Sequence, residues 1–176
     1  MALKLGADWH IQVDADNPPT APLDTIVPIL NAAASRRFGM IVSPSVNKRG
    51  VVGVNPPGGG KYGGLGEIPV GQTFEVSGGT GGVMAFSKAC LEVFPPLNYV
   101  NIPLGQGKTE KVPNYYPWSD YQQASGSEES EDYALARRIR EVTPFRIGSD
   151  TRLKSTHFKS FGIPSWTGYA ENPGQL

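Results

Sequence analysis

The chain has 176 residues, and its Gly 22 and Pro 16 make up about one residue in five, against roughly one in eight in average proteins. This length fits one domain with its own core, whereas so much glycine and proline excludes a mainly helical fold. Lys+Arg 16 balance Asp+Glu 16, which argues against a general nucleic-acid binder, and an aromatic content of 10% excludes an ordinary disordered chain.

The first predicted elements are a strand and a helix. Residues 8–13 alternate as a strand does, and residues 24–37 place apolar side chains on one helical face. Pro28 fits this helix best if the helix begins at about Val27, with the proline in its first turn. Gly39 stands where a glycine commonly follows a helix end.

Short apolar runs at residues 40–42 and 51–54 are separated by turn-forming residues, and they predict a β-hairpin. Residues 55–66 are too rich in glycine and proline for any regular element. Residues 68–76 then alternate around Gly71, which predicts a strand with a kink or a bulge.

Three further segments follow a second glycine run, residues 78–82. Residues 83–94 carry a helical apolar stripe and predict a helix that ends at two prolines. Residues 97–104 predict a strand or an extended run. Residues 111–121 hold four aromatic residues among two prolines and predict an extended segment on the surface.

The clearest predicted helix covers about residues 127–142. Ser125 or Ser127 is its expected N-cap. Acidic residues in its first turns and basic residues in its last turns match the helix dipole. Pro144 is expected to end it.

Together, about three helices and several short strands predict an α+β or β-rich fold with extended N- and C-terminal arms. We expect a single compact body at residues 1–143, with irregular loops at 55–66 and 78–82. Residues 144–176 are expected to form an extended C-terminal arm.

Targeting signals are not evident in the sequence. No apolar stretch is long enough for a membrane-spanning helix, and no basic region precedes an apolar block, so we expect no signal peptide and no membrane contact. The single Cys90 argues mildly for a reducing compartment.

Charge is segregated along the chain although its sum is zero. No acidic residue lies between Asp24 and Glu67, no basic residue lies between Lys111 and Arg137, and basic residues dominate from Arg137 to Lys159. Solvated faces are the plain interpretation. Complementary patches that join neighbouring copies are the sharper one, and contact with nucleic-acid phosphate is the least favoured.

Candidate catalytic and metal sites are weak. His10, Asp14 and Asp16 share one face of the predicted first strand, but no second histidine lies nearby, so we expect no metal site and no cofactor. The glycine run before the predicted helix could present backbone N–H groups to an anion, yet it lacks the nucleotide-binding motifs. Cys90 is expected to be a core thiol.

Two aromatic clusters and one basic helix end are the expected partner interface, since tyrosine, tryptophan and arginine are enriched at interfaces. The alternative for the first cluster is a loop folded against its own core. The expected interface residues are Tyr115, Tyr116, Trp118, Tyr121, Arg137, Arg138, Arg140, Phe158, Phe161, Trp166 and Tyr169.

These observations favour a non-enzymatic structural subunit of a large assembly, whose arms contact neighbouring subunits, copies of itself included. A virion component (capsid cement, minor capsid or head–tail connector protein) is the favoured form, located in the virion. The alternatives are a linker or accessory subunit of a cellular complex in the cytoplasm, a small-molecule or glycan-binding module using residues 115–121, and an enzyme using the His10 face.

Overall fold

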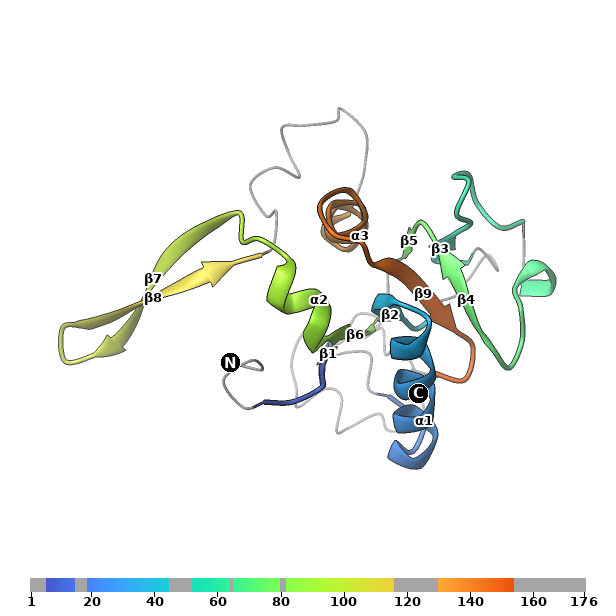
Figure 1. The fold of residues 1–176 in the computed structure, drawn as a ribbon, viewed down its shortest axis with the longest axis horizontal. Coiled ribbons are helices and arrows are strands. Elements are labelled where there is room, and N and C mark those ends of the chain that lie inside the picture. The colour runs from blue at the N-terminus through green and yellow to red at the C-terminus, as the bar shows by residue number, and fades with distance from the viewer. Residues whose placement is uncertain are drawn as a thin grey trace, which may run out of the picture.

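The computed structural model describes residues 6–14, 19–44, 52–63, 65–79, 82–115 and 130–153. They form one compact α+β domain around a five-stranded sheet with the strand order β1-β6-β2-β9-β4 (Figure 1). Three of its strands run one way: β1 (Trp9–Val13), β2 (Phe38–Val42) and β9 (Arg146–Asp150). The other two run the opposite way: β4 (Thr73–Val76) and β6 (Val83–Ser87).

Two smaller antiparallel pairs accompany this sheet. Strand β3 (Val54–Asn55) pairs with β5 (Gly78–Gly79), and a short 3₁₀ helix, η2 (Leu65–Glu67), lies between them in the sequence. Strands β7 (Asn98–Gly105) and β8 (Lys108–Asn114) form a hairpin of their own.

Helices cover both faces of the large sheet (Figure 1). Helix α1 (Leu23–Ser35) packs on one face, where its buried Ile29 and Leu30 join Ile41 in one apolar cluster. Helices α2 (Lys88–Val93) and α3 (Glu131–Val142) contribute to the cluster on the other face. Since both faces are covered, all five residues of β2 and of β6 are buried.

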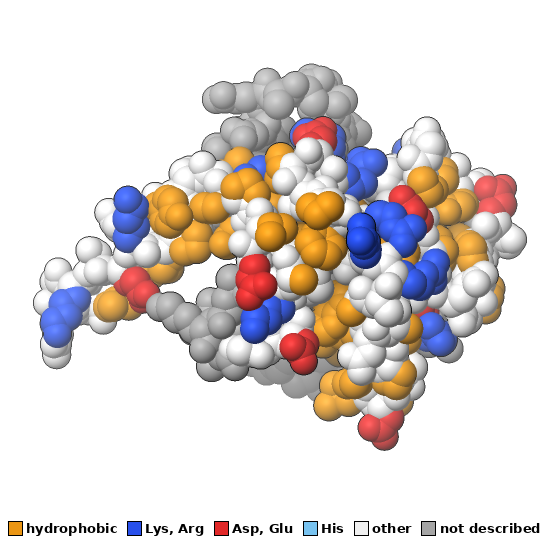
Figure 2. Space-filling model, in the orientation of Figure 1, with side chains coloured by type: hydrophobic (Ala, Val, Ile, Leu, Met, Phe, Trp, Pro, Cys, Tyr) orange, Lys and Arg blue, Asp and Glu red, His pale blue; other side chains and the backbone are white. Residues whose placement is uncertain are grey.

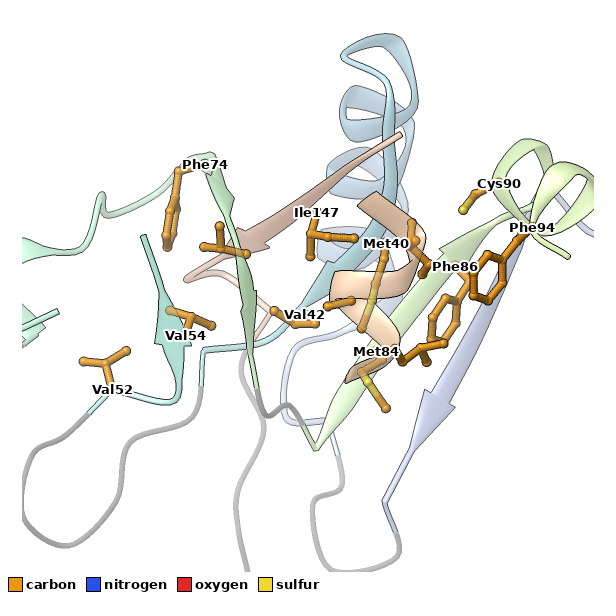
Figure 3. Close-up of a cluster of buried hydrophobic side chains, with 14 of the residues drawn as sticks. Met40, Val42, Val52, Val54, Phe74, Met84, Phe86, Cys90, Phe94 and Ile147 are labelled. Atoms are coloured by element: carbon orange, nitrogen blue, oxygen red, sulfur yellow. The ribbon is translucent and has the colours of Figure 1, made fainter. Parts of the chain in front are cut away.

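The larger core cluster lies between the sheet, α2 and α3, and continues towards β3 and β4 (Figure 3). Met40, Met84 and Ile147 from the sheet are at most 1% exposed. Full burial of one such side chain contributes about 1.5–3 kcal/mol. This cluster is therefore the main source of stability in the domain.

Gly39 lies inside β2 and meets this core at close range. A Cβ atom there would lie 2.6 Å from Cβ of Phe145 and 2.8 Å from Sγ of Cys90. The glycine is therefore needed for packing and does not end α1 as predicted. The residue that takes the left-handed conformation after α1 is Arg37, with φ 60°.

Several predicted elements are confirmed: the strand near residues 8–13, the helix near 24–37, the strand near 97–104 and the helix near 127–142. Pro28 was placed wrongly, since α1 begins at Leu23 and the proline lies in its second turn. Pro28 itself is exposed, while Ile26 and Ile29 on either side of it are buried. The predicted caps Ser125 and Ser127 lie outside the described residues.

The predicted hairpin of residues 40–42 with 51–54 is wrong. Strand β2 pairs with β6 and β9, and residues 54–55 pair with β5 instead. A strand buried on both faces takes its partners from distant parts of the chain, which local turn signals do not reveal.

The predicted helix at residues 83–94 is wrong in its first half, which is strand β6. The helix begins only after Ser87, whose Oγ accepts a hydrogen bond from the N–H of Cys90. An apolar run buried on both faces does not alternate, so its period resembles that of a helix.

The predicted boundary after residue 143 is also wrong. Strand β9 lies inside the sheet between β2 and β4, and its Ile147 and Gly148 are buried. The body therefore extends at least to Leu153, which is 3% exposed. Residues 154–176, the rest of the predicted arm, lie outside the described residues. None of the described helices is long and apolar enough to cross a membrane.

Candidate functional site

The β7–β8 hairpin is the candidate interaction site, because it extends away from the body into solvent (Figure 1). Its register runs from Asn98 opposite Asn114 to Gly105 opposite Lys108. Gln106 and Gly107 form its turn with φ values of 51° and 73°, as the two-residue turn that matches the strand twist requires. Every residue of β7 is exposed.

The hairpin carries apolar side chains that its own fold does not bury. Val100, Ile102 and Leu104 are 42%, 44% and 61% exposed. Val112 lies opposite Val100, and since alternate residues of a strand share a face, Val100, Ile102 and Val112 form one apolar row. Hydrophobic side chains line the hairpin in Figure 2. We call this row the hairpin face.

Arg138 of α3 fixes the root of the hairpin. Its Cζ lies 4.6 Å from the ring centroid of Phe94, whose ring stacks on Tyr115 at 5.7 Å. Its Nη2 donates to the carbonyl of Pro95 at 2.5 Å, and its Nη1 donates to the carbonyl of Tyr115 at 3.4 Å. One guanidinium thus holds the segments on both sides of the hairpin, and it sets the direction in which the hairpin projects.

The predicted aromatic interface is placed only in part. Tyr115 is half-buried and packs against the core, as the alternative of a loop folded on its own core requires. The remaining predicted aromatic residues lie outside the described residues: Tyr116, Trp118, Tyr121, Phe158, Phe161, Trp166 and Tyr169.

The three predicted arginines of α3 do not act together. Arg138 holds the hairpin root, as described above. Arg137 forms an exposed ion pair with Glu141 at 3.2 Å, one turn further along the helix. Arg140 is exposed in the last turn, where a positive charge favours the helix dipole. Arg137 and Arg140 therefore remain on the exposed surface of α3, whereas Arg138 is used within the fold.

Sequence reasoning missed the hairpin face, although a signal was present. Two runs of residues with strand character flank Gly105-Gln106-Gly107, which is a typical hairpin turn. Pro103 and Pro113 obscured it, since proline is depleted in strands. Both strands of an isolated hairpin are edge strands, which is where proline is tolerated.

The His10 face, at which the sequence predicts no metal site, is described only in part. His10 lies on β1 with its ring 6.3 Å from that of Phe86, and Asp16 lies outside the described residues. Among the described residues, no three metal-binding side chains gather at one place. A strand and not a helix follows Gly82, so the glycine run does not lie at a helix N-terminus and the anion-binding alternative loses its basis.

The pKa values of two buried groups, the Cys90 thiol and the Asp150 carboxyl, are shifted by their surroundings in the fold. Cys90 is fully buried, which confirms the predicted core thiol, and this burial raises the pKa of the thiol to about 11. Burial opposes ionisation of Asp150, but hydrogen bonds from Arg152 and Thr73 outweigh it and hold the pKa of this carboxyl below its ordinary value. The donor atoms lie 2.7–2.9 Å from the carboxylate oxygens.

The three strands that run in the same direction have their carboxyl-terminal ends on the same side of the sheet. Asp14 follows β1, Ser43 follows β2 and Asp150 ends β9. In open α/β sheets, small ligands commonly bind outside such carboxyl ends.

Comparison with known proteins shows a likeness of fold to a solved structure. No protein-family model and no curated protein matches the chain. The crystal structure of A197 from STIV, a virus protein, resembles it with a TM-score of 0.54 and 15% sequence identity. The match covers 90% of this chain and 61% of A197, so this chain spans less than two thirds of its neighbour. At this identity the likeness concerns the fold alone.

Proposed function

We propose that the chain is a structural subunit of a multi-protein assembly and docks on a neighbouring subunit through the β7–β8 hairpin. The observation that carries this proposal is the apolar hairpin face, exposed on an element that projects from the body. The proposal assigns the chain no catalytic step.

Elementary energetics support docking. A hairpin of two strands with no layer over its face is only marginally stable in water. Complete burial of a valine or isoleucine side chain contributes about 1.5–3 kcal/mol, and Val100 and Ile102 are still nearly half exposed. A partner surface that covered the hairpin face would gain this free energy and stabilise the hairpin at the same time.

Arg138 adds to the case, because an arm that docks must point in a fixed direction. A hairpin held at its root loses less conformational freedom on binding than a flexible loop does. The contacts of Arg138 with Pro95 and Tyr115 hold it in this way.

A virion component remains the favoured form of this subunit, as a capsid cement, minor capsid or head–tail connector protein located in the virion. The fold it shares with A197, a virus protein, supports this form. A linker or accessory subunit of a cellular complex would use the same hairpin. Copies of the chain itself are the expected first partners.

The test compares two faces of the hairpin by light scattering after size-exclusion chromatography. The double variant Val100→Thr and Ile102→Thr keeps strand propensity but makes the hairpin face polar. We expect the full chain to associate and this variant to be a folded monomer. Asn101→Thr, on the opposite face, is the matched control and should associate normally. A full chain that stays monomeric at high concentration contradicts the proposal.

A second candidate function is small-molecule binding at the side of the sheet where the carboxyl-terminal ends of β1, β2 and β9 lie. Asp14 is exposed there and offers a carboxylate to a ligand, whereas Ser43 and Asp150 are fully buried and contribute to the structure of that end of the sheet. The check is backbone amide NMR with a panel of small polar ligands. Shifts confined to Asp14, Ser43 and Thr151 would support a binding module, and a spectrum unchanged by the whole panel would remove it.

A further inference from the structure

Three arginines meet where α1 ends and β9 begins. Arg36 and Arg37 directly follow α1, and Arg146 is the first residue of β9. The backbone N–H of Arg146 donates to the carbonyl of Arg37 at 3.1 Å, which joins the two segments. Figure 2 shows Lys and Arg side chains gathered over this part of the body. We call Arg36, Arg37 and Arg146 the arginine cluster.

Two members of the cluster are held in place. The Cζ atoms of Arg36 and Arg146 lie 5.1 Å and 4.8 Å from the ring centroid of Phe38, which is fully buried. Nη1 of Arg36 donates to the carbonyl of Thr73 at 2.8 Å, and Nη1 of Arg146 lies 3.1 Å from Oε2 of Glu75. Arg146 also donates to the carbonyl of Arg36. Both guanidinium groups are therefore pre-organised at the surface.

The third member, Arg37, has an unfavourable backbone for its residue type. Its φ of 60° lies in the left-handed region, where a side chain crowds the backbone and glycine is preferred. Its side chain is exposed and makes no hydrogen bond or ion pair with any residue in the described part of the chain. Folding alone would favour glycine at this position, so the arginine requires another explanation.

The helix dipole explains part of the cluster but not all of it. The C-terminal end of α1 is its negative pole and favours a nearby cation. Arg36 already lies at that end, bonded to Thr73 and stacked on Phe38. The dipole of α1 acts through charge alone. It therefore explains neither the position of Arg146 at the start of β9 nor the left-handed backbone of Arg37.

The charge and the donors of the cluster suit an oxyanion. Arg36 and Arg146 carry two positive charges over Phe38, and the carboxylate in their described contacts is that of Glu75, which pairs with Arg146. The exposed Arg37 adds a third positive charge at the residue next to Arg36. An arginine has five N–H donors in a rigid fork that matches phosphate, and the contacts described above use one donor of Arg36 and two of Arg146. Several donors therefore remain for a ligand.

We infer that the arginine cluster binds a single phosphate group, either as free phosphate or as part of a phosphate ester. One group fits better than a long polyanion, because the cluster occupies one place and the whole chain has no excess of positive charge. This inference is independent of the hairpin and of the proposed assembly.

The test titrates the full chain with inorganic phosphate and with phenyl phosphate, followed by the NMR signals of the arginine side chains. We expect saturable binding, with shifts at Arg36, Arg37 and Arg146. Tighter binding of phenyl phosphate would identify an ester as the ligand, and equal or weaker binding would identify the free anion.

Arg37→Gly is the decisive variant, because glycine relieves the backbone while it removes the guanidinium. It should stay folded and bind phosphate about tenfold more weakly. Arg137→Ala, which removes another exposed arginine, is the matched control and should bind normally. The inference is overturned if no saturation is seen or if both variants weaken binding equally. Tight binding of oligo-dT that survives Arg37→Gly would also overturn it and identify a nucleic-acid surface instead.

Discussion

The central sheet and the β7–β8 hairpin use the same backbone conformation with opposite exposure. All residues of β6 are buried, since helices cover both faces of the sheet, whereas all residues of β7 are exposed. The apolar side chains of β6 are therefore already covered within the fold, and those of the hairpin face are not. The difference separates the residues that stabilise the domain from those that remain available to a partner.

The sharpest test of this comparison replaces one isoleucine by alanine in the central sheet and one in the hairpin. Ile147→Ala removes a side chain with 0% exposure from the core and should lower the free energy of unfolding by about 2–5 kcal/mol. Ile102→Ala, on the hairpin face, should change it by less than about 0.5 kcal/mol. Urea denaturation measures both values. Similar losses would mean that the hairpin face is buried in solution.

A second variant adds atoms to the core. Gly39→Ala would place a Cβ atom 2.8 Å from Sγ of Cys90 and closer still to Phe145, so neighbouring atoms must move. We expect a loss of about 1–3 kcal/mol in the free energy of unfolding. Gly66→Ala is the control, because no atom lies within 4 Å of its added Cβ. A tolerated Gly39→Ala would show that β2 is packed less tightly than described.

A third variant separates the hairpin from the body. Arg138→Ala removes the stack on Phe94 and both root hydrogen bonds, which together contribute about 1–2 kcal/mol. We expect faster hydrogen exchange in residues 98–114 and unchanged exchange in the central sheet. Arg137→Ala on the same helix should change neither region. Uniformly faster exchange after Arg138→Ala would show that the arginine stabilises the body as a whole.

Much of the fold follows from the sequence where the signal is local. The helix at residues 131–142 has charges that match its dipole, and apolar and polar residue types alternate along the strand at 9–13. Strands β6 and β9 were missed for a physical reason. A strand covered on both faces loses its alternation, and its partners come from distant parts of the sequence.

The hairpin was not indicated as the candidate site by the sequence. The predicted interface residues lie at 115–121, at the end of α3 and at 158–169 rather than on the hairpin, and Tyr115 and Arg138 form the root of the hairpin rather than its contact face. Only the register shows that Val100, Ile102 and Val112 share one side. The arginine cluster was equally hidden, because Arg37 and Arg146 are far apart in the sequence and meet only through sheet pairing.

The smallest expected effect is the dependence of the free energy of unfolding on pH, which arises in the central sheet and not in the hairpin. The pKa of Asp150 is lower in the folded state than its ordinary value of 3.8, so the unfolded chain binds the proton more readily. The stabilisation is complete above the ordinary value and is lost as pH falls through the folded pKa. The effect is modest because the partner Arg152 is 43% exposed and solvent screens the pair. Urea unfolding between pH 6 and pH 3 should show it, and Asp150→Asn should flatten this dependence. A pH dependence that Asp150→Asn leaves intact would assign the effect to other carboxylates.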